Sequence, residues 1–475
     1  MLREPVPLLP LNELGAVHFI AIGGAGMSGV AQSYLDRGVA VSGSDRQDSE
    51  ALRSLAAAGA RVWVGHDAAH LDGVDTVVVS SAIRPDNPEL AEAQRRGLRI
   101  WHRSAALAAL MAGRRVIAVA GTHGKTTTSG MCADLLTALG RDPSYVIGAP
   151  LVTSGHSSHL GDGAEFVVEA DESDGSFHQY PSQIAIVTSI EADHLDNWGT
   201  PAAYAAGFER FARGETVEIV VADGDEPGSA ALAAHLRGEG RAVVTYGVGE
   251  GSDLRLSDLV TTIEGASAHL DISPGSVIGP QQSWSGKLRL AVPGEHNLRD
   301  AAAAVAAGLC LGIDPAAVVD GAAAFAGTKR RFQVVGRRGD ITVIDDYAHH
   351  PTEIAATIAT ARALATTGRV IVCFQPHLFT RTRDFADDFG RALAAADEVV
   401  VTGIFAARED PIPGVTGRLV ADAAQAHGAS VHYAEDLAEA GRLTAALARP
   451  GDIVVTVGAG SVTTIGPAIL EEVRV

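Results

Sequence analysis

The sequence contains very little lysine. Only Lys125, Lys287 and Lys329 occur among 475 residues, and Lys plus Arg total 37 against 57 Asp plus Glu. The formal net charge of −20 excludes broad binding to nucleic acid or to an anionic membrane, since both need a positive surface. An anionic small substrate must therefore be bound by local groups of Arg, Lys and backbone N–H.

Cysteine and long hydrophobic runs are also scarce. Cys132, Cys310 and Cys373 show no CxxC spacing, which predicts reduced, buried side chains. The N-terminal segment lacks the basic and then apolar regions of a secretory signal. The longest apolar helical stretch, 301–313, is too short to cross a bilayer. We therefore expect a cytoplasmic protein with no nucleic-acid or membrane partner.

Short β-branched runs alternate with Ala-rich helical segments almost throughout the chain. This alternation predicts parallel sheets covered by helices, and the length allows roughly three domains. We expect a Rossmann-like domain at 1–111, a central P-loop ATPase-type α/β domain at 112–331, and a C-terminal Rossmann-like α/β domain at 332–475. Within 250–292, alternating apolar and polar positions instead predict added antiparallel strands.

A glycine-rich segment follows the first predicted strand, 17–22. Gly24, Gly26 and Gly29 spell G-x-G-x-x-G in a predicted tight loop at 23–29, and Asp45 ends the next strand. Glycine lets the backbone approach a pyrophosphate, and the helix N-terminus supplies positive potential. The pattern predicts a site for NAD(P) or for another diphosphate-bearing nucleotide such as a UDP-sugar. The competing interpretation is a tight turn with no ligand.

A second glycine loop runs from Gly121 to Thr126 between a strand at 115–120 and a helix. Its backbone N–H groups would bind phosphates, Lys125 would reach the β and γ oxygens, and the Thr126 hydroxyl would contact Mg²⁺. Val119 stands where the standard Walker pattern has glycine, so this loop is shorter. A helix that merely begins with Lys and Thr is the alternative, and the scarcity of lysine argues against it.

Two acidic segments, 169–174 and 191–196, each follow a predicted strand of the same sheet. They would bring carboxylate and imidazole groups close to the phosphate loop, which suits Mg²⁺ bound to ATP oxygens. Solvated acidic loops are the competing interpretation, and it applies to Asp171, Asp174, Asp193 and Asp196.

The shortened loop, G-T-H-G-K-T-T, resembles the ATP loop of the Mur ligases, a family that also includes folylpolyglutamate synthetase. The resemblance extends through nearly the whole chain. Its E-A-D-E-S-D segment, followed by Ser176 and Phe177, looks like that of the L-alanine-adding member. The resemblance implies ATP-dependent joining of L-alanine to UDP-N-acetylmuramate through an acyl phosphate, in peptidoglycan synthesis. It also implies Mg²⁺ or Mn²⁺ as cofactor, and we expect a monomer or homodimer.

The resemblance further implies roles for individual residues. The expected ATP-binding residues are Gly121, Thr122, His123, Gly124, Lys125, Thr126, Thr127, Asn297, Arg331 and Asp346. The expected UDP-sugar-binding residues are Gly24, Ala25, Gly26, Met27, Ser28, Asp45 and Ser81. The expected metal ligands are Thr126, Glu169 and His194, with Glu172 in reserve. The expected catalytic residues are Lys125, His194, Arg331, His349, His377 and Arg381.

The sequence departs from the family pattern at two of these segments. Asp300 stands where the family usually repeats an asparagine after Asn297, and a carboxylate accepts hydrogen bonds but cannot donate them as an amide does. Ala348 replaces the glycine of D-D-Y-G-H-H-P. By itself, Asn297 could also be only a helix N-cap.

Three other functions stay open at this point. A murein-recycling ligase would add a tripeptide to the same UDP-sugar with the same chemistry. The first glycine segment alone permits an NAD-dependent oxidoreductase, which would leave the phosphate loop and acidic segments without a purpose. A regulatory nucleotide-binding module without catalysis fits poorly with the combination of Lys125, Thr126, Glu169 and His194.

Overall fold

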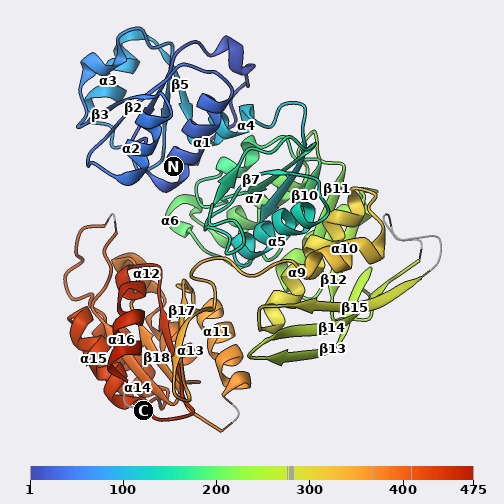
Figure 1. Cartoon of the computed structure of the whole chain (residues 1–475), viewed down its shortest axis with the longest axis vertical. Coiled ribbons are helices and arrows are strands. Elements are labelled where there is room, and N and C mark those ends of the chain that lie inside the picture. The colour runs from blue at the N-terminus through green and yellow to red at the C-terminus, as the bar shows by residue number, and fades with distance from the viewer. Residues whose placement is uncertain (1, 275–276, 278–282, 366, 408, 474–475) are drawn as a thin grey trace. The chain divides into compact units, whose positions relative to one another are not determined.

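The computed structural model describes residues 2–274, 277, 283–365, 367–407 and 409–473, with only the backbone of Ala25. Its contacts divide the chain into two compact units. The first unit comprises Met1–Ser257, His269–Leu288 and Arg299–Phe325, and the second comprises Asp258–Ala268, Arg289–Leu298 and Ala326–Val475. Three sheets with flanking helices make up the fold, which confirms the predicted α/β class (Figure 1).

The first sheet has five parallel strands in the order β3-β2-β1-β4-β5. Its strands are β1 (Val17–Ile20), β2 (Val41–Asp45), β3 (Arg61–Val64), β4 (Thr76–Val79) and β5 (Arg99–His102). Its helices are η1 (Leu11–Glu13), α1 (Ala25–Asp36), α2 (Glu50–Ala57), η2 (Ala68–Leu71), α3 (Pro88–Arg96) and α4 (Arg103–Ala109). The predicted loop at 23–29 is wrong in extent, because α1 already begins at Ala25 and Gly24 is its extended N-cap.

The second sheet has ten strands in the order β15-β14-β13-β12-β11-β10-β6-β9-β7-β8. Its strands are β6 (Arg115–Ala120), β7 (Ser144–Val146), β8 (Ser158–His159), β9 (Glu165–Glu169), β10 (Ile184–Val187), β11 (Ile219–Asp223), β12 (Val243–Gly247), β13 (Leu254–Thr262), β14 (Gly265–Ile272) and β15 (Trp284–Leu290). Its helices are α5 (Lys125–Ala138), η3 (Ser176–Gln179), α6 (Leu195–Trp198), α7 (Pro201–Ala212), α8 (Pro227–Gly238), α9 (Glu295–Cys310) and α10 (Pro315–Ala322).

The centre of this second sheet is parallel. Strand β6 lies between β10 and β9, so the segments that follow these three strands meet at one edge of the sheet. Burial alternates along β13 and β14, and only residues 263–264 join them, which requires an antiparallel hairpin. The prediction of antiparallel strands in this part of the chain is therefore confirmed.

The third sheet has six strands in the order β16-β17-β21-β18-β19-β20. Its strands are β16 (Gln333–Arg338), β17 (Ile341–Asp346), β18 (Val370–Phe374), β19 (Glu398–Thr402), β20 (Val431–Ala434) and β21 (Ile453–Val457). Its helices are α11 (Pro351–Leu364), α12 (Phe379–Asp384), α13 (Ala386–Leu393), α14 (Arg418–Ala426), α15 (Leu437–Leu447), η4 (Ser461–Ile465) and α16 (Gly466–Glu472). Strand β16 runs antiparallel to β17, unlike the predicted parallel sheet, because Gly339 at φ +54° turns the chain within two residues.

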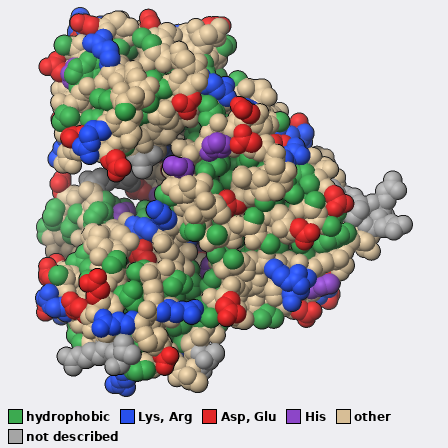
Figure 2. Space-filling view, in the orientation of Figure 1, with side chains coloured by type: hydrophobic (Ala, Val, Ile, Leu, Met, Phe, Trp, Pro, Cys, Tyr) green, Lys and Arg blue, Asp and Glu red, His purple; other side chains and the backbone are tan. Residues whose placement is uncertain are grey.

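The remaining predictions from composition concern cysteines, surface charge and membrane spans. All three cysteines are buried and unpaired, as expected. On the face drawn in Figure 2, basic side chains form small separate groups among acidic ones. Among the described residues, no helix combines the length and the apolar character that crossing a membrane requires.

Candidate active site

The phosphate loop lies between the end of β6 and the start of α5. Gly121 and Gly124 have φ angles of +143° and +81°, which favour glycine. A Cβ at Gly121 would collide with the Thr188 side chain, and one at Gly124 would lie 2.7 Å from Oδ1 of Asp300. Thr126 and Thr127 are buried in the first turn of α5. The backbone N–H groups at this helix N-terminus form a site suited to an anion.

Lys125 forms a buried ion pair with Glu172. The Lys125 Nζ atom lies 2.9 Å from Oε2 and 3.0 Å from Oε1 of Glu172, whose side chain is 1% exposed. The same Nζ donates to the carbonyl oxygens of Gly121 and Thr122, at 2.5 and 3.2 Å. Burial alone would lower the pKa of Lys125, but nearby carboxylates, chiefly that of Glu172, outweigh it and raise the pKa. The lysine is therefore charged and held within its own loop.

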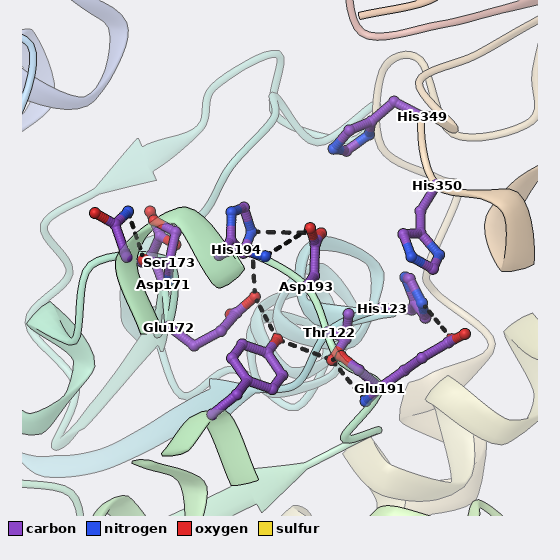
Figure 3. Close-up of polar contacts among 12 residues, drawn as sticks. Thr122, His123, Asp171, Glu172, Ser173, Glu191, Asp193, His194, His349 and His350 are labelled. Carbon is purple, nitrogen blue, oxygen red and sulfur yellow. Dashed lines mark hydrogen bonds and ion pairs between the residues drawn. The ribbon is translucent and has the colours of Figure 1, made fainter. Parts of the chain in front are cut away.

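The loop is also tied to the segment that follows β10. The Thr122 hydroxyl donates to the Glu191 carbonyl oxygen at 2.8 Å and accepts from the Glu191 N–H at 2.9 Å. His123 Nε2 lies 3.0 Å from Oε2 of Glu191 (Figure 3). The Tyr204 hydroxyl lies 2.9 Å from Oγ1 of Thr122 and donates to Oε1 of Glu172 at 3.3 Å.

The predicted metal ligands follow β6, β9 and β10: Thr126 lies in the first turn of α5, Glu169 ends β9, and His194 is the N-cap of α6. His194 Nε2 is 3.8 Å from Oε1 of Glu172 and 3.6 Å from Oδ2 of Asp193. Glu169 accepts a hydrogen bond from the Gly148 N–H at 2.6 Å, and its charge helps to raise the pKa of Lys125. The structure thus brings His194 to Glu172, the reserve ligand. Carboxylates, an imidazole and the Thr126 hydroxyl around a phosphate loop are a donor set that fits Mg²⁺ or Mn²⁺.

The expected UDP-sugar residues lie at the carboxyl ends of β1, β2 and β4. Asp45 Oδ2 accepts from the Gly23 N–H at 2.9 Å and so braces the glycine turn. A side chain on Gly26 would collide with Arg103, whereas the Met27 side chain is buried in the core. Gly24 and Ser28 belong to the same helix start, and the side chain of Ala25 lies outside the described residues.

Ser81 connects the first sheet to the acidic segment after β9. Its hydroxyl donates to Oδ2 of Asp174 and lies 3.1 Å from Nε2 of His102. Burial lowers the pKa of His102 to about 4, so this imidazole is neutral at physiological pH. Asp174 therefore has a definite partner in the fold and is not a freely solvated acid.

The second unit gathers several of the other predicted residues near the end of β17. Asp346 accepts from the N–H groups of Phe332 and Ala348, at 2.8 and 2.7 Å, and burial raises its pKa to about 6. The rings of His349 and His377 lie 5.9 Å apart. Burial lowers the pKa of His349 to about 3, which keeps its ring neutral.

Two arginines and Asn297 complete the predicted set. Arg331 lies over the Tyr347 ring at 5.2 Å, and Arg381 is buried in α12. Asn297 is not the N-cap of α9, because that helix already begins at Glu295. Its amide nitrogen donates to the Pro293 carbonyl oxygen at 2.6 Å.

Sequence reasoning missed two aromatic residues of the site. Tyr204 contacts both Thr122 and Glu172, and the Trp198 indole N–H donates to the Glu172 carbonyl oxygen at 3.0 Å. Both residues lie in helical segments and resemble ordinary core aromatics. Their polar atoms acquire a role only through the tertiary fold, so no local signal identified them.

Comparison with protein-family models gives three consecutive matches. Residues 16–115 match the Mur ligase family catalytic domain, 119–308 the Mur ligase middle domain, and 330–460 the glutamate ligase domain of Mur ligases. The curated UDP-N-acetylmuramate–L-alanine ligase of Cutibacterium acnes is 59% identical, and the match covers 99% of this chain and 98% of the relative. The ligase of the same description from Kineococcus radiotolerans is 54% identical, over 96% of each chain.

Solved structures show the same arrangement of elements. The UDP-N-acetylmuramate–alanine ligase of Thermotoga maritima superposes with a TM-score of 0.76 at 28% identity, covering 96% of this chain and 98% of that one. A murein peptide ligase from Psychrobacter arcticus superposes with a TM-score of 0.67 at 24% identity, with the same coverage. The second likeness shows the fold alone.

Proposed function

The chain belongs to the Mur ligase family, and we propose that it joins L-alanine to the carboxylate of UDP-N-acetylmuramic acid. The reaction converts ATP to ADP and phosphate and yields UDP-N-acetylmuramoyl-L-alanine, a peptidoglycan precursor. Identity of 59% over nearly the full length to a ligase of this description supports the choice of alanine. The buried Lys125–Glu172 pair at the phosphate loop is the structural observation that carries the proposal.

The chemistry begins with activation of the sugar's carboxylate. A carboxylate is a poor electrophile, so one of its oxygens first attacks the γ-phosphorus of ATP and ADP departs. The alanine amine, after losing a proton, attacks the acyl carbon of the resulting acyl phosphate. Inorganic phosphate then leaves with the former carboxylate oxygen, and an amide bond remains. This route requires the reacting groups to be held in line and their negative charge to be offset.

Lys125 is the residue that offsets charge on the transferring phosphoryl group. The N–H groups at the start of α5, from Gly124 to Thr127, would bind the phosphate oxygens, with the positive end of α5 directed at them. Thr126, Glu169 and His194, with Glu172 beside them, would hold Mg²⁺. A bound Mg²⁺ supplies further neutralisation of the triphosphate. The donor types at these positions support this assignment.

The other sites serve binding and orientation. The start of α1, with Asp45 and Ser81, would bind the UDP-sugar. In the second unit, Asp346 would accept a hydrogen bond from the ATP ribose, and Asn297 would contact adenine. The expected catalytic groups Arg331, His349, His377 and Arg381 would meet phosphate and carboxylate charges. We propose that domain 1–111 binds the UDP-sugar, that domain 112–331 binds ATP, and that domain 332–475 closes on ATP and the amino acid. We also propose that the protein acts in the cytoplasm, where these substrates occur.

The experiment is a substrate panel with purified protein. ADP release and product mass are measured with UDP-N-acetylmuramate, ATP and Mg²⁺, together with L-alanine, glycine, L-serine or L-alanyl-γ-D-glutamyl-diaminopimelate. We expect the highest kcat/KM with L-alanine. Preference for the tripeptide would instead identify a recycling ligase. Absence of ATP consumption with every amine would overturn the proposal.

A further inference from the structure

The Tyr204 hydroxyl extends from a group of buried aromatic side chains to the phosphate loop. The residue lies in α7 and is 1% exposed. Its ring packs edge-on against Trp198 and Phe208, with centroids 5.9 and 5.2 Å apart. Its hydroxyl lies between Thr122 and Glu172. The aromatic contacts fix the ring, so the position of the hydroxyl is determined by the core.

The hydroxyls of Tyr204 and Thr122 have two protons and make three polar contacts. Thr122 donates its proton to the Glu191 carbonyl oxygen, 2.8 Å away. Tyr204 donates its proton to Oε1 of Glu172 at 3.3 Å, and its oxygen also lies 2.9 Å from Oγ1 of Thr122. Because the two bonds use different protons, both hydroxyls are satisfied in this arrangement. Tyr204 is therefore already placed to hold the Glu172 carboxylate without a movement of its ring.

The Glu172 carboxylate needs this donor most when Lys125 turns to the triphosphate. In this structure Nζ contacts both Glu172 oxygens and two carbonyl oxygens of the loop. Reaching the γ-phosphate requires Lys125 to leave at least some of these contacts. A buried carboxylate that loses its cation is strongly unfavourable unless other donors replace it.

We propose that Tyr204 is a positioning residue for ATP binding, which stabilises the Glu172 carboxylate when Lys125 turns from it to the phosphates. This inference rests on the proposed function in assigning Lys125 to ATP. A merely structural Tyr204 would fill the core beside Trp198 and Phe208, and the loss of its hydroxyl would act on stability alone.

Tyr204→Phe keeps the ring and removes only the hydroxyl. We expect the Kd for ATP, measured by calorimetry without the other substrates, to rise roughly tenfold, as loss of a hydrogen bond to a charged group implies. KM for ATP should rise in parallel, while KM for the UDP-sugar and for L-alanine stays within about twofold. Tyr34→Phe is the matched control, because the buried Tyr34 hydroxyl of α1 donates to the Ala106 carbonyl oxygen of α4, away from the ATP loop.

A double-mutant cycle with Glu172→Gln separates positioning from packing. The neutral side chain needs no compensation when Lys125 moves, so adding Tyr204→Phe to Glu172→Gln should leave ATP affinity unchanged within about twofold. The inference would be overturned if Tyr204→Phe lowered ATP affinity equally in the wild-type and Glu172→Gln proteins. It would also be overturned if Tyr204→Phe bound ATP as tightly as the wild type. If the wild type bound ATP but formed no product, the proposed function would fail, and the binding cycle would still decide the role of Tyr204.

Discussion

Lys125 and Glu172 face each other across the phosphate loop, with Nζ 2.9 Å from Oε2. The carboxylate is 1% exposed and the lysine side chain 16% exposed, so this pair is largely removed from water. The lysine expected to contact ATP is therefore held by a carboxylate from the segment that follows the neighbouring strand β9. This relationship couples the phosphate loop to the acidic segment.

Lys125→Ala should lower the rate of phosphoryl transfer about 10³-fold, because the main positive side chain at the γ-phosphate is lost. Binding of the UDP-sugar, measured by calorimetry, should remain near the wild-type value, since the first sheet is untouched. Lys287→Ala is the control, as Lys287 is exposed on β15. Near-normal ADP release by Lys125→Ala would contradict the assignment.

His194→Ala should raise the Mg²⁺ concentration needed for half-maximal activity about tenfold, because the imidazole next to Glu172 is removed. The measurement is a Mg²⁺ titration at saturating ATP, compared with His235→Ala, whose side chain is exposed on α8. An unchanged titration curve would exclude His194 as a ligand.

Ser81→Ala should raise KM for the UDP-sugar roughly threefold to tenfold, because the hydroxyl at the end of β4 and its bond to Asp174 are both lost. KM for ATP should change by less than about twofold. Equal changes in KM for the UDP-sugar and KM for ATP would show that Ser81 acts only through the stability of the fold.

Three histidines surround the buried carboxylate of Glu89, which lies in α3 beside the first sheet. His70 and His66 lie 2.7 and 3.0 Å from its oxygens, and His18 lies 3.5 Å away. Ser44 donates to it at 2.6 Å. Burial alone would raise the pKa of Glu89, but hydrogen bonds from His18, Ser44 and His70 outweigh it and lower the pKa to about 2.

Glu89→Gln should therefore destabilise the protein in a pH-dependent way. The folded pKa lies below the unfolded value of 4.5, so ionised Glu89 stabilises the fold above that pH, by about 3 kcal/mol. This contribution is lost as pH falls from 4.5 to about 2. Urea unfolding from pH 6 downward should show that the difference in free energy of unfolding between wild type and variant shrinks below pH 4.5. A difference that stays constant with pH would contradict the lowered pKa of Glu89.

Much of the fold follows from local patterns in the sequence. The run from Arg115 to Ala120 forms β6 as predicted, and the helix expected after the glycine loop is α5, which begins at Lys125. Strongly periodic or continuous apolar runs determine such elements locally. The antiparallel direction of β16 was not predicted, because it depends on the turn at Gly339 and not on apolar periodicity.

The phosphate loop was predicted from the sequence, but the contacts among its side chains were not. Glu169 and Glu172 have similar sequence surroundings, and only the fold reveals that Glu172 lies against Lys125 while Glu169 binds the Gly148 N–H. Similarly, Glu89 resembled an ordinary helix-start acid until the fold brought three histidines to it. Tertiary contacts between distant segments carry no local sequence signal.

The central claim is that the γ-phosphoryl group passes to the sugar's carboxylate before the amide bond forms. UDP-N-acetylmuramate labelled with ¹⁸O in its carboxyl group tests this most directly, with mass spectrometry of the released phosphate in the presence of L-alanine and ATP. The account predicts one ¹⁸O atom transferred to each phosphate formed from fully labelled substrate. Phosphate free of ¹⁸O, alongside normal amide formation, would contradict it.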